Sequence, residues 1–168
     1  MIIREQFYNK MYDYRCSIKY LELYLNETVK YHNIWRIVIA VTSCSAIACW
    51  TKWTNLSYLW GVIIVASEVA SVILEYLPYD FRKKELFRAV TLKTPIVSEM
   101  EHDWNEILIN SIADSEINDL LLKYKKRWDS TENRLFENTS LSPKTKLMVL
   151  AQTEIKTEYD ELYGGNDE

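Results

Sequence analysis

The sequence is poor in residues that turn a chain or break a helix, because its 168 residues include only three glycines and three prolines. Sandwiches, barrels and doubly wound sheets need turn residues about every ten positions, so this shortage argues against all of them. We find no GxxxxGK[ST], GxGxxG, GxSxG or HExxH motif, and so few glycines cannot build a phosphate-binding loop. The sequence therefore predicts an all-α protein without catalytic residues or a cofactor.

Cysteine and histidine are also scarce. The three cysteines, an odd number, do not form a closed set of disulfides, and the two histidines, His32 and His102, lie far apart. Their spacing from the cysteines does not match a metal site. His102 lies in an acidic stretch, which we interpret as the exposed side of a helix. The net charge of −4 gives no general reason to expect nucleic acid as a partner.

Two apolar stretches are present in the first half of the chain. Residues 37–50 carry no charge and, with 34–36 and 51, reach about 18 residues, enough to cross the hydrocarbon of a bilayer. Residues 56–77, about 22 in number, contain only two charged side chains, Glu68 and Glu75. Because residues 52–55 leave room only for a tight reversal, we expect an antiparallel transmembrane hairpin. The alternative is a bundle in which both helices are buried in protein, since a charge-free run of about 14 residues fits either environment.

Basic residues predict the orientation of this hairpin. Lys19, Lys30 and Arg36 precede or begin the first span, a cluster from Arg82 to Lys93 follows the second, and the connection holds only Lys52. The excess of positive charge at both ends favours two cytoplasmic termini. We expect a cytoplasmic helix over 1–33 that runs into the first span, a transmembrane hairpin over 34–78 with spans at about 34–51 and 56–77, and a cytoplasmic helical bundle over 79–168.

The flanking segments show the apolar periodicity of helices. Thr94-Pro95 is expected to be a boundary between two of them. The predicted buried faces hold Phe7, Met11, Ile18, Leu21, Leu25 and Val29 in the first helix, then Met100, Trp104, Ile107, Leu108 and Ile112, and finally Ile117, Leu120, Leu121, Tyr124 and Trp128.

Glu68 is costly near the middle of a span and should not face lipid. On a helix it shares one stripe with small and acidic residues, and the predicted pore-lining set is Gly61, Ile64, Glu68, Ser71 and Glu75. If several copies assemble, with a tetramer as our expectation, the carboxylates form stacked rings that favour cations. The alternative is that Glu68 is protonated, or bonds Ser43 or Ser45, and only holds the helices together.

The order of these parts resembles the SLATT families, two-span bacterial membrane proteins found beside nucleotide-second-messenger and related conflict systems. The resemblance is carried by local patterns around the two spans, namely Tyr31, His32, Trp35 and Arg36 before the first span and the segment 77–81 with Lys83 and Lys84 after the second. Two further patterns are the start of a helix at Glu99–Trp104 and a late helix that starts at Pro143 and has Glu158-Tyr159 and Tyr163-Gly164 at its end.

The resemblance implies a bacterial inner-membrane protein, a homo-oligomeric pore or ion channel that depolarises the cell in antiviral defence. The implied signal is a nucleotide or oligonucleotide made by a separately encoded nucleotidyltransferase. Arg82, Lys83, Lys84 and Arg88 are expected to contact anionic membrane lipid or such a ligand. The alternative function is a membrane-anchored adaptor that recruits a cytoplasmic enzyme through the apolar stripe containing Trp104 and Trp128.

Overall fold

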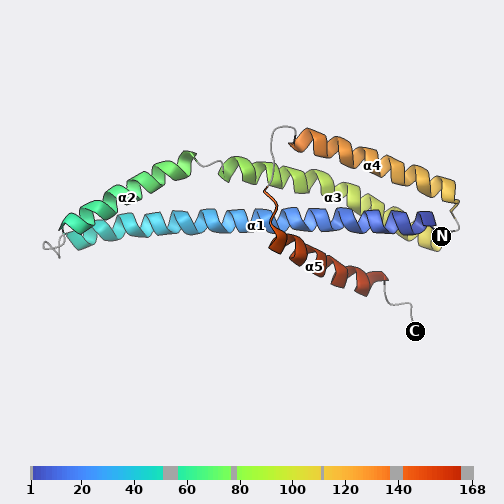
Figure 1. The fold of residues 1–168 in the computed structure, drawn as a ribbon, viewed down its shortest axis with the longest axis horizontal. Helices are drawn as coiled ribbons and strands as arrows, with labels where there is room; N and C mark the ends of the chain where they lie inside the picture. The colour runs from blue at the N-terminus through green and yellow to red at the C-terminus, as the bar shows by residue number, and fades with distance from the viewer. Residues whose placement is uncertain (1, 51–56, 77–78, 111, 137–141, 164–168) are drawn as a thin grey trace. The chain divides into compact units, whose positions relative to one another are not determined.

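The computed structural model describes residues 2–50, 57–76, 79–110, 112–136 and 142–163. Within these ranges the side chains of 42–50, 57, 59–60, 73–76, 79–81 and 136 are not described. The described chain is helical, as predicted (Figure 1). Its helices are α1 (Ile2–Trp50), α2 (Ser57–Tyr76), α3 (Tyr79–Ile109), α4 (Asp114–Phe136) and α5 (Thr145–Tyr163).

The helices form two compact units. Unit 1 contains Met1–Leu25 and Lys84–Glu168, and unit 2 contains Asn26–Lys83. The beginning of α1 therefore belongs to the same unit as α4 and α5. The helix predicted over residues 1–33, which is expected to run into the first span, is part of the continuous helix α1.

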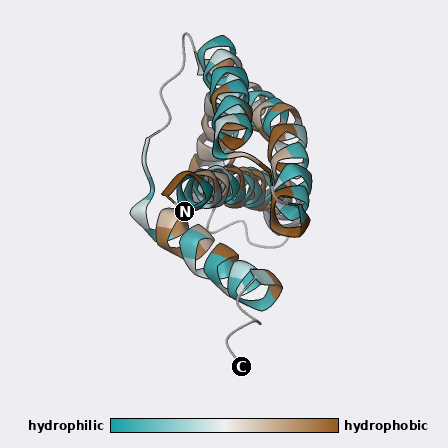
Figure 2. Ribbon diagram, turned by 90° about the vertical axis from the view of Figure 1, so that its right-hand side faces the viewer, coloured by the Kyte–Doolittle hydropathy of each residue, from teal (hydrophilic) through white to brown (hydrophobic). Residues whose placement is uncertain are grey.

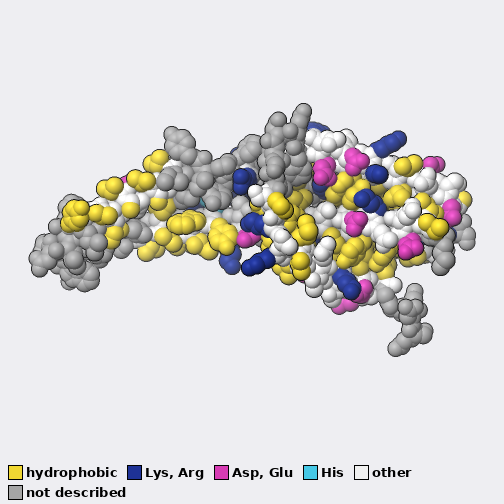
Figure 3. Space-filling view, viewed as in Figure 1, with side chains coloured by type: hydrophobic (Ala, Val, Ile, Leu, Met, Phe, Trp, Pro, Cys, Tyr) yellow, Lys and Arg dark blue, Asp and Glu magenta, His cyan; other side chains and the backbone are white. Residues whose placement is uncertain are grey.

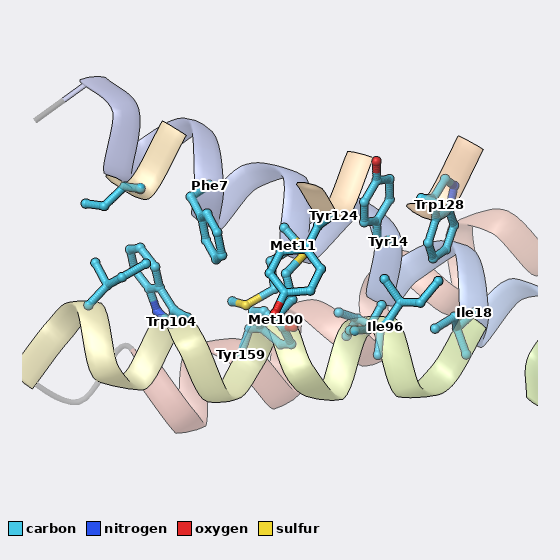
Figure 4. Close-up of a cluster of buried hydrophobic side chains, with 14 residues drawn as sticks. Phe7, Met11, Tyr14, Ile18, Ile96, Met100, Trp104, Tyr124, Trp128 and Tyr159 are labelled. Atoms are coloured by element: carbon cyan, nitrogen blue, oxygen red, sulfur yellow. The ribbon is translucent and has the colours of Figure 1, made fainter. Parts of the chain in front are cut away.

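Unit 1 is organised around a cluster of buried side chains to which α1, α3, α4 and α5 contribute (Figure 4). Phe7 of α1 stacks on Trp104 of α3 with ring centroids 5.9 Å apart, and Tyr14 stacks on Trp128 of α4 at 4.0 Å. The predicted face of the first helix is confirmed at Phe7, Met11, Ile18 and Leu21, which are all buried. Leu108 is more than half exposed, so its predicted place on the buried face is wrong.

The aromatic cluster is completed by hydrogen bonds from tyrosine hydroxyls to carboxylates of α3. Tyr124 donates to Asp103 over 2.6 Å, and Tyr159 donates to Glu101 over 2.9 Å. Burial and the adjacent carboxylates raise the pKa of both hydroxyls above the ordinary value. The large rings therefore bury their apolar area while each hydroxyl keeps an acceptor.

Ion pairs join α1 to α5 at the edge of this core. Arg15 lies 3.2 Å from Glu158, and Lys19, one turn later, lies 2.8 Å from Glu154. Hydrophobic and hydrophilic residues alternate around α5, as Figure 2 shows. Its buried residues are Ala151, Ile155 and Tyr159. The helix therefore presents one apolar side to the core and one charged side to its surroundings.

The predicted boundary at Thr94-Pro95 is wrong, because Pro95 lies inside α3. The ring of Pro95 is exposed, and Ile96 and Val97 directly after it are buried. Thr94 donates from its hydroxyl to the carbonyl of Val90 over 2.8 Å. Packing of the following turn into the core keeps the helix continuous where proline would otherwise end it.

Unit 2 contains the second part of α1 and α2, which run antiparallel (Figure 1). Ser67 is buried in α2 and donates to the carbonyl of Ile64 over 2.8 Å. Its neighbours on the same side of α2 are half-buried, namely Ile63, Ile64, Ala70 and Ser71. This face of α2 is therefore covered within the unit, and it is formed largely by small side chains.

The expected integral membrane architecture is corrected by the structure. Among the described residues, no helix has a stretch that is both long and apolar enough to span a bilayer. In α2 the polar side chains of Ser67, Glu68 and Ser71 follow one another within about one turn. In α1 Arg36 limits the charge-free run to 37–50, about 14 residues, where a span needs about 17–25. The same finding contradicts the expected inner-membrane localisation.

Candidate functional site

The predicted pore-lining residues share one side of α2, as expected from their spacing, but they differ in exposure. Ile64 and Ser71 are half-buried, whereas Gly61 and Glu68 are exposed, and the side chain of Glu75 lies outside the described residues. Nothing lies within 4 Å of a Cβ placed on Gly61, so this glycine does not mark a close helix contact. Glu68 lies between the buried face of α2 and the exposed one.

The exposed face of α2 carries valines in place of polar residues. Val62, Val65, Val69 and Val72, the valine stripe, are 49%, 64%, 53% and 51% exposed. Their spacing of three, four and three residues places them on one side of the helix, opposite Ser67. The four side chains together form an exposed apolar row along α2.

The second part of α1 adds to this surface. Its exposed large apolar side chains are Tyr31, Ile34, Trp35, Ile37, Val38 and Val41. On the face shown in Figure 3, hydrophobic side chains gather over α2 and the adjoining part of α1, and most Lys, Arg, Asp and Glu side chains lie elsewhere. We call these residues and the valine stripe together the apolar surface of unit 2.

Unit 1 contains a groove of about 510 Å³ between α1, α3, α4 and α5. It is lined by Tyr12, Asp13, Cys16, Ser17, Tyr20, Leu21, Lys93, Trp128, Glu132, Met148 and Gln152. Burial raises the pKa of the Cys16 thiol, which keeps it protonated and a poor nucleophile near neutral pH. The lining is largely aromatic and apolar, as in sites for small apolar ligands.

Lys93 is the cation of this groove and is only 3% exposed. Its Nζ lies 4.3 Å from the centroid of the Trp128 ring and 3.2 Å from Oε2 of Glu132. Burial lowers the pKa of Lys93, and the Glu132 carboxylate partly offsets this effect. The ammonium is therefore held by groups of the protein itself.

The charge of the groove does not suit a nucleotide. Asp13 and Glu132 contribute two carboxylates to the lining, and Lys93 contributes one ammonium that already pairs with Glu132. A phosphate group would be repelled by the net negative charge of the lining, which makes its binding less favourable. The groove favours a neutral or cationic apolar compound.

The predicted contacts for anionic lipid or a ligand are all exposed residues of α3. Arg82 and Lys83 belong to unit 2, and Lys84 and Arg88 belong to unit 1. They follow one another near the start of the helix. Their role stays a prediction.

Trp104 and Trp128, expected on a partner-binding stripe, lie in the core of unit 1 and are 8% and 5% exposed. They support the fold and do not present a surface to a partner. His102 lies on the exposed side of α3, with Nε2 3.7 Å from Glu106. The side-chain atoms of His102, Asp103 and Glu106 that could bind a metal ion lie within 4.8 Å of one another. Asp103 already accepts a hydrogen bond from the hydroxyl of Tyr124.

The sequence analysis did not identify the four valines as one stripe, and it did not predict the groove. The stripe has a clear signal, the three-four-three spacing, which the polar residues between the valines obscure. Tyr12, Cys16 and Tyr20 recur every four residues in α1 and so share one face. Lys93, Met148 and Gln152 come to the groove from other helices through the tertiary fold, so no local sequence pattern predicts that they line it.

Comparisons with protein-family models, with curated proteins and with solved structures find no match for this chain.

Proposed function

We propose that this protein is an assembly protein, whose unit 2 binds another protein chain through its apolar surface. The observation that carries the proposal is the valine stripe, in which four apolar side chains on one side of α2 are each about half exposed or more. Removing such a row from water is favourable by about 25 cal/mol per Å² of apolar area, which supplies a driving force for association.

The pore-forming role implied by the resemblance requires two membrane spans, and we do not carry it into this proposal. It stays a prediction of the resemblance, together with the nucleotide signal. The adaptor function retains support from the apolar surface, although recruitment through Trp104 and Trp128 has none, because these rings are buried.

Native mass spectrometry of the full-length protein tests the proposal. We expect complexes heavier than the 20.0 kDa chain, and we expect the substitution of Val65 and Val69 by lysine to remove them. Val149 of α5 is 56% exposed, so Val149→Lys is a matched control for the same change outside unit 2. Complexes that survive the changes at Val65 and Val69, or that Val149→Lys removes as well, would contradict the proposal.

A further inference from the structure

A second hollow of unit 1 lies at the end of α5 and brings together four aromatic rings and one carboxylate. Its volume is about 390 Å³, and its lining includes Tyr8 of α1, Trp104 of α3, and Tyr159, Asp160 and Tyr163 of α5. We propose that this aromatic hollow binds the alkylated ammonium group of an organic cation. The hollow lies within unit 1, so the inference goes beyond the proposed function of unit 2.

The first support is the arrangement of the rings. Tyr8 lies 6.0 Å from Tyr163 with the two ring planes at 90°, and Tyr159 lies 5.3 Å from Tyr163 with the planes at 64°. Trp104 lies 5.6 Å from Tyr8. Rings at steep angles turn their faces toward one small volume from different directions, and each face carries the negative end of the ring quadrupole. A cation in the hollow therefore lies near more than one ring face, which is the arrangement that stabilises alkylated ammonium groups.

The second support is the exposure of these rings. Tyr8 and Tyr163 are half-buried, whereas Tyr159 and Trp104 are 1% and 8% exposed and close the inner end of the hollow. The Nε1 atom of Trp104 is buried, so the indole offers its ring to the hollow and not its N–H. An alkylated ammonium group carries its charge under methyl groups and needs no hydrogen-bond acceptor. It therefore suits this lining better than a primary ammonium, which has three N–H donors to satisfy.

The third support is the charge of the hollow. Among the described residues that line it, Asp160 supplies a carboxylate and no Lys or Arg is present. The carboxylate lies close enough to Tyr8 that, after burial, it raises the pKa of the Tyr8 hydroxyl above its ordinary value. Arg15 lies on the far side of the tyrosines, and its charge is offset by Glu158 at 3.2 Å and Glu101 at 3.8 Å. A cation that enters the hollow is therefore attracted by a carboxylate and meets no cation of the lining.

The fourth support is that two helices end at the hollow. α3 ends at Ile109 and α5 at Tyr163, and their last turns reach the lining through Leu108 and Tyr163. Neither last turn contains a basic residue. Arg4 donates to the carbonyl of Ile112 beyond α3 and is not part of the lining. Carbonyl groups without an intrahelical partner give the C-terminal end of a helix a partial negative charge, so both ends add to the attraction for a cation.

Nuclear magnetic resonance titration of the full-length protein tests the proposal with two ligands of matched shape. Choline carries a trimethylammonium group, and its neutral carbon analogue, dimethylbutanol, carries a tert-butyl group in the same place. We expect choline to bind at least about tenfold more tightly, because only the charged ligand gains from the ring faces and the carboxylate. Equal affinities of the two ligands, or no binding of choline at millimolar concentrations, would overturn the proposal.

A change of charge at the hollow supplies a second test. Asp160 is exposed, so Asp160→Asn should keep the fold, and we expect it to raise the dissociation constant of choline at least about threefold. Asp119→Asn is the matched control, because Asp119 is an exposed residue of α4 outside the hollow and should leave the affinity unchanged. An unchanged affinity in Asp160→Asn, or an equal loss in Asp119→Asn, would overturn the proposal.

Two changes at Tyr8 separate the role of its ring from that of its hydroxyl. Tyr8→Phe keeps the ring and should leave the affinity for choline within about twofold, whereas Tyr8→Leu removes the ring and should weaken binding at least about tenfold. Tyr20→Leu, at another half-buried tyrosine of α1 outside the hollow, is the control. Equal affinities of the phenylalanine and leucine variants would overturn the proposal. If Tyr8→Leu does not fold, as judged by circular dichroism, the two ligands and the change at Asp160 still decide the question.

The trimethylammonium group occurs both in dissolved cations and in the headgroup of phosphatidylcholine. Flotation with vesicles of phosphatidylcholine, compared with vesicles of phosphatidylglycerol, distinguishes these two sources. Flotation with phosphatidylcholine alone, abolished by an excess of choline, assigns the group to the lipid headgroup. Binding of choline without flotation assigns it to a dissolved cation, and either result supports the aromatic hollow as the site.

Discussion

Lys93 is held in unit 1 by an aromatic stack and one carboxylate. Tyr14 lies on one face of the Trp128 ring at 4.0 Å, so the ammonium of Lys93, 4.3 Å from the same ring centre, lies on the other face. The side chain of Glu132 is half exposed and provides the counter-charge at 3.2 Å. A charged amine that is almost fully buried costs free energy, which the ring and the carboxylate recover in part.

Lys93→Met should stabilise the protein more near neutral pH than near pH 10. Burial lowers the pKa of Lys93 below 10.5 in the folded chain, so the unfolded chain binds the proton more strongly. The stability of the wild-type protein therefore rises as the pH passes from the folded pKa to about 10.5, whereas the methionine variant lacks this rise. Urea unfolding at about pH 7 and pH 10 measures the free energy of unfolding of both proteins. An advantage of the methionine variant that grows toward pH 10 would contradict this prediction.

Tyr14→Phe should reduce the loss of stability in alkali. Burial raises the pKa of Tyr14 to about 12, compared with 10.0 in the unfolded chain. Between these values the folded chain holds a proton that the unfolded chain has released, so stability falls as the pH rises. The phenylalanine variant keeps the stacked ring without the titrating hydroxyl. Thermal melts at about pH 9, 10 and 11 should show a melting temperature that falls less with pH for the variant than for the wild-type protein. An equal fall in both proteins would contradict this role of Tyr14.

At the scale of the helices, Pro95 shows how far tertiary packing can overrule a local signal. The residue interrupts the hydrogen-bond ladder of α3 at the carbonyl of Thr91, yet α3 continues to Ile109. Lys93, Ile96 and Val97 on either side of it are buried. The burial of these neighbours supplies the free energy that holds the helix together across the proline.

Pro95→Ala should raise the free energy of unfolding by about 1–2 kcal/mol, because it restores one backbone hydrogen bond and removes a poor helix former at an exposed position. The gain is less than the full propensity difference, since proline also restricts the unfolded chain. Ser98→Ala, exposed in the same helix, is the control and should gain only about 0.5 kcal/mol or less. Equal gains in guanidinium unfolding would mean that Pro95 is not strained.

Helices and their buried faces were predictable where apolar residues recur over several turns. The spacing of Phe7, Met11 and Ile18 identified the inner face of α1, and low glycine and proline content identified the all-α class. The exposure of Leu108 was not predictable, because it follows Ile107, and only the direction of packing decides which of two adjacent residues points inward. The groove was out of reach for the same reason, since Tyr20, Lys93 and Met148 meet only in the folded unit.

At the scale of the whole molecule, the apolar content of residues 34–77 led to the wrong architecture. A charge-free run near the lower length limit for a span also fits a helix that associates with protein. The valine stripe could be recognised from its spacing, but its exposure could be learned only from the structure. The sequence therefore indicated that this segment is apolar and could not indicate what it meets.

Unit 1 is discontinuous in sequence, and both of its buried apolar clusters are formed by residues outside 26–83. Leu25 packs against the same small cluster as Leu86, so a short glycine-serine linker can join Leu25 to Lys84. We expect the resulting chain of roughly 110 residues, a usual size for one domain, to remain helical and to unfold cooperatively, with the near-ultraviolet circular dichroism of Trp104 and Trp128 retained.

A second deletion tests whether this cooperativity comes from the core. Removing α5 takes away Ala151, Ile155 and Tyr159 from the buried face, together with the partners of Arg15 and Lys19. Because the lost tyrosine and isoleucine leave a cavity worth several kcal/mol, about the whole stability of a small domain, this variant should lose its cooperative transition. If the linker variant is also non-cooperative, unit 1 depends on residues 26–83 for its stability, and the division into two units does not describe how the protein folds.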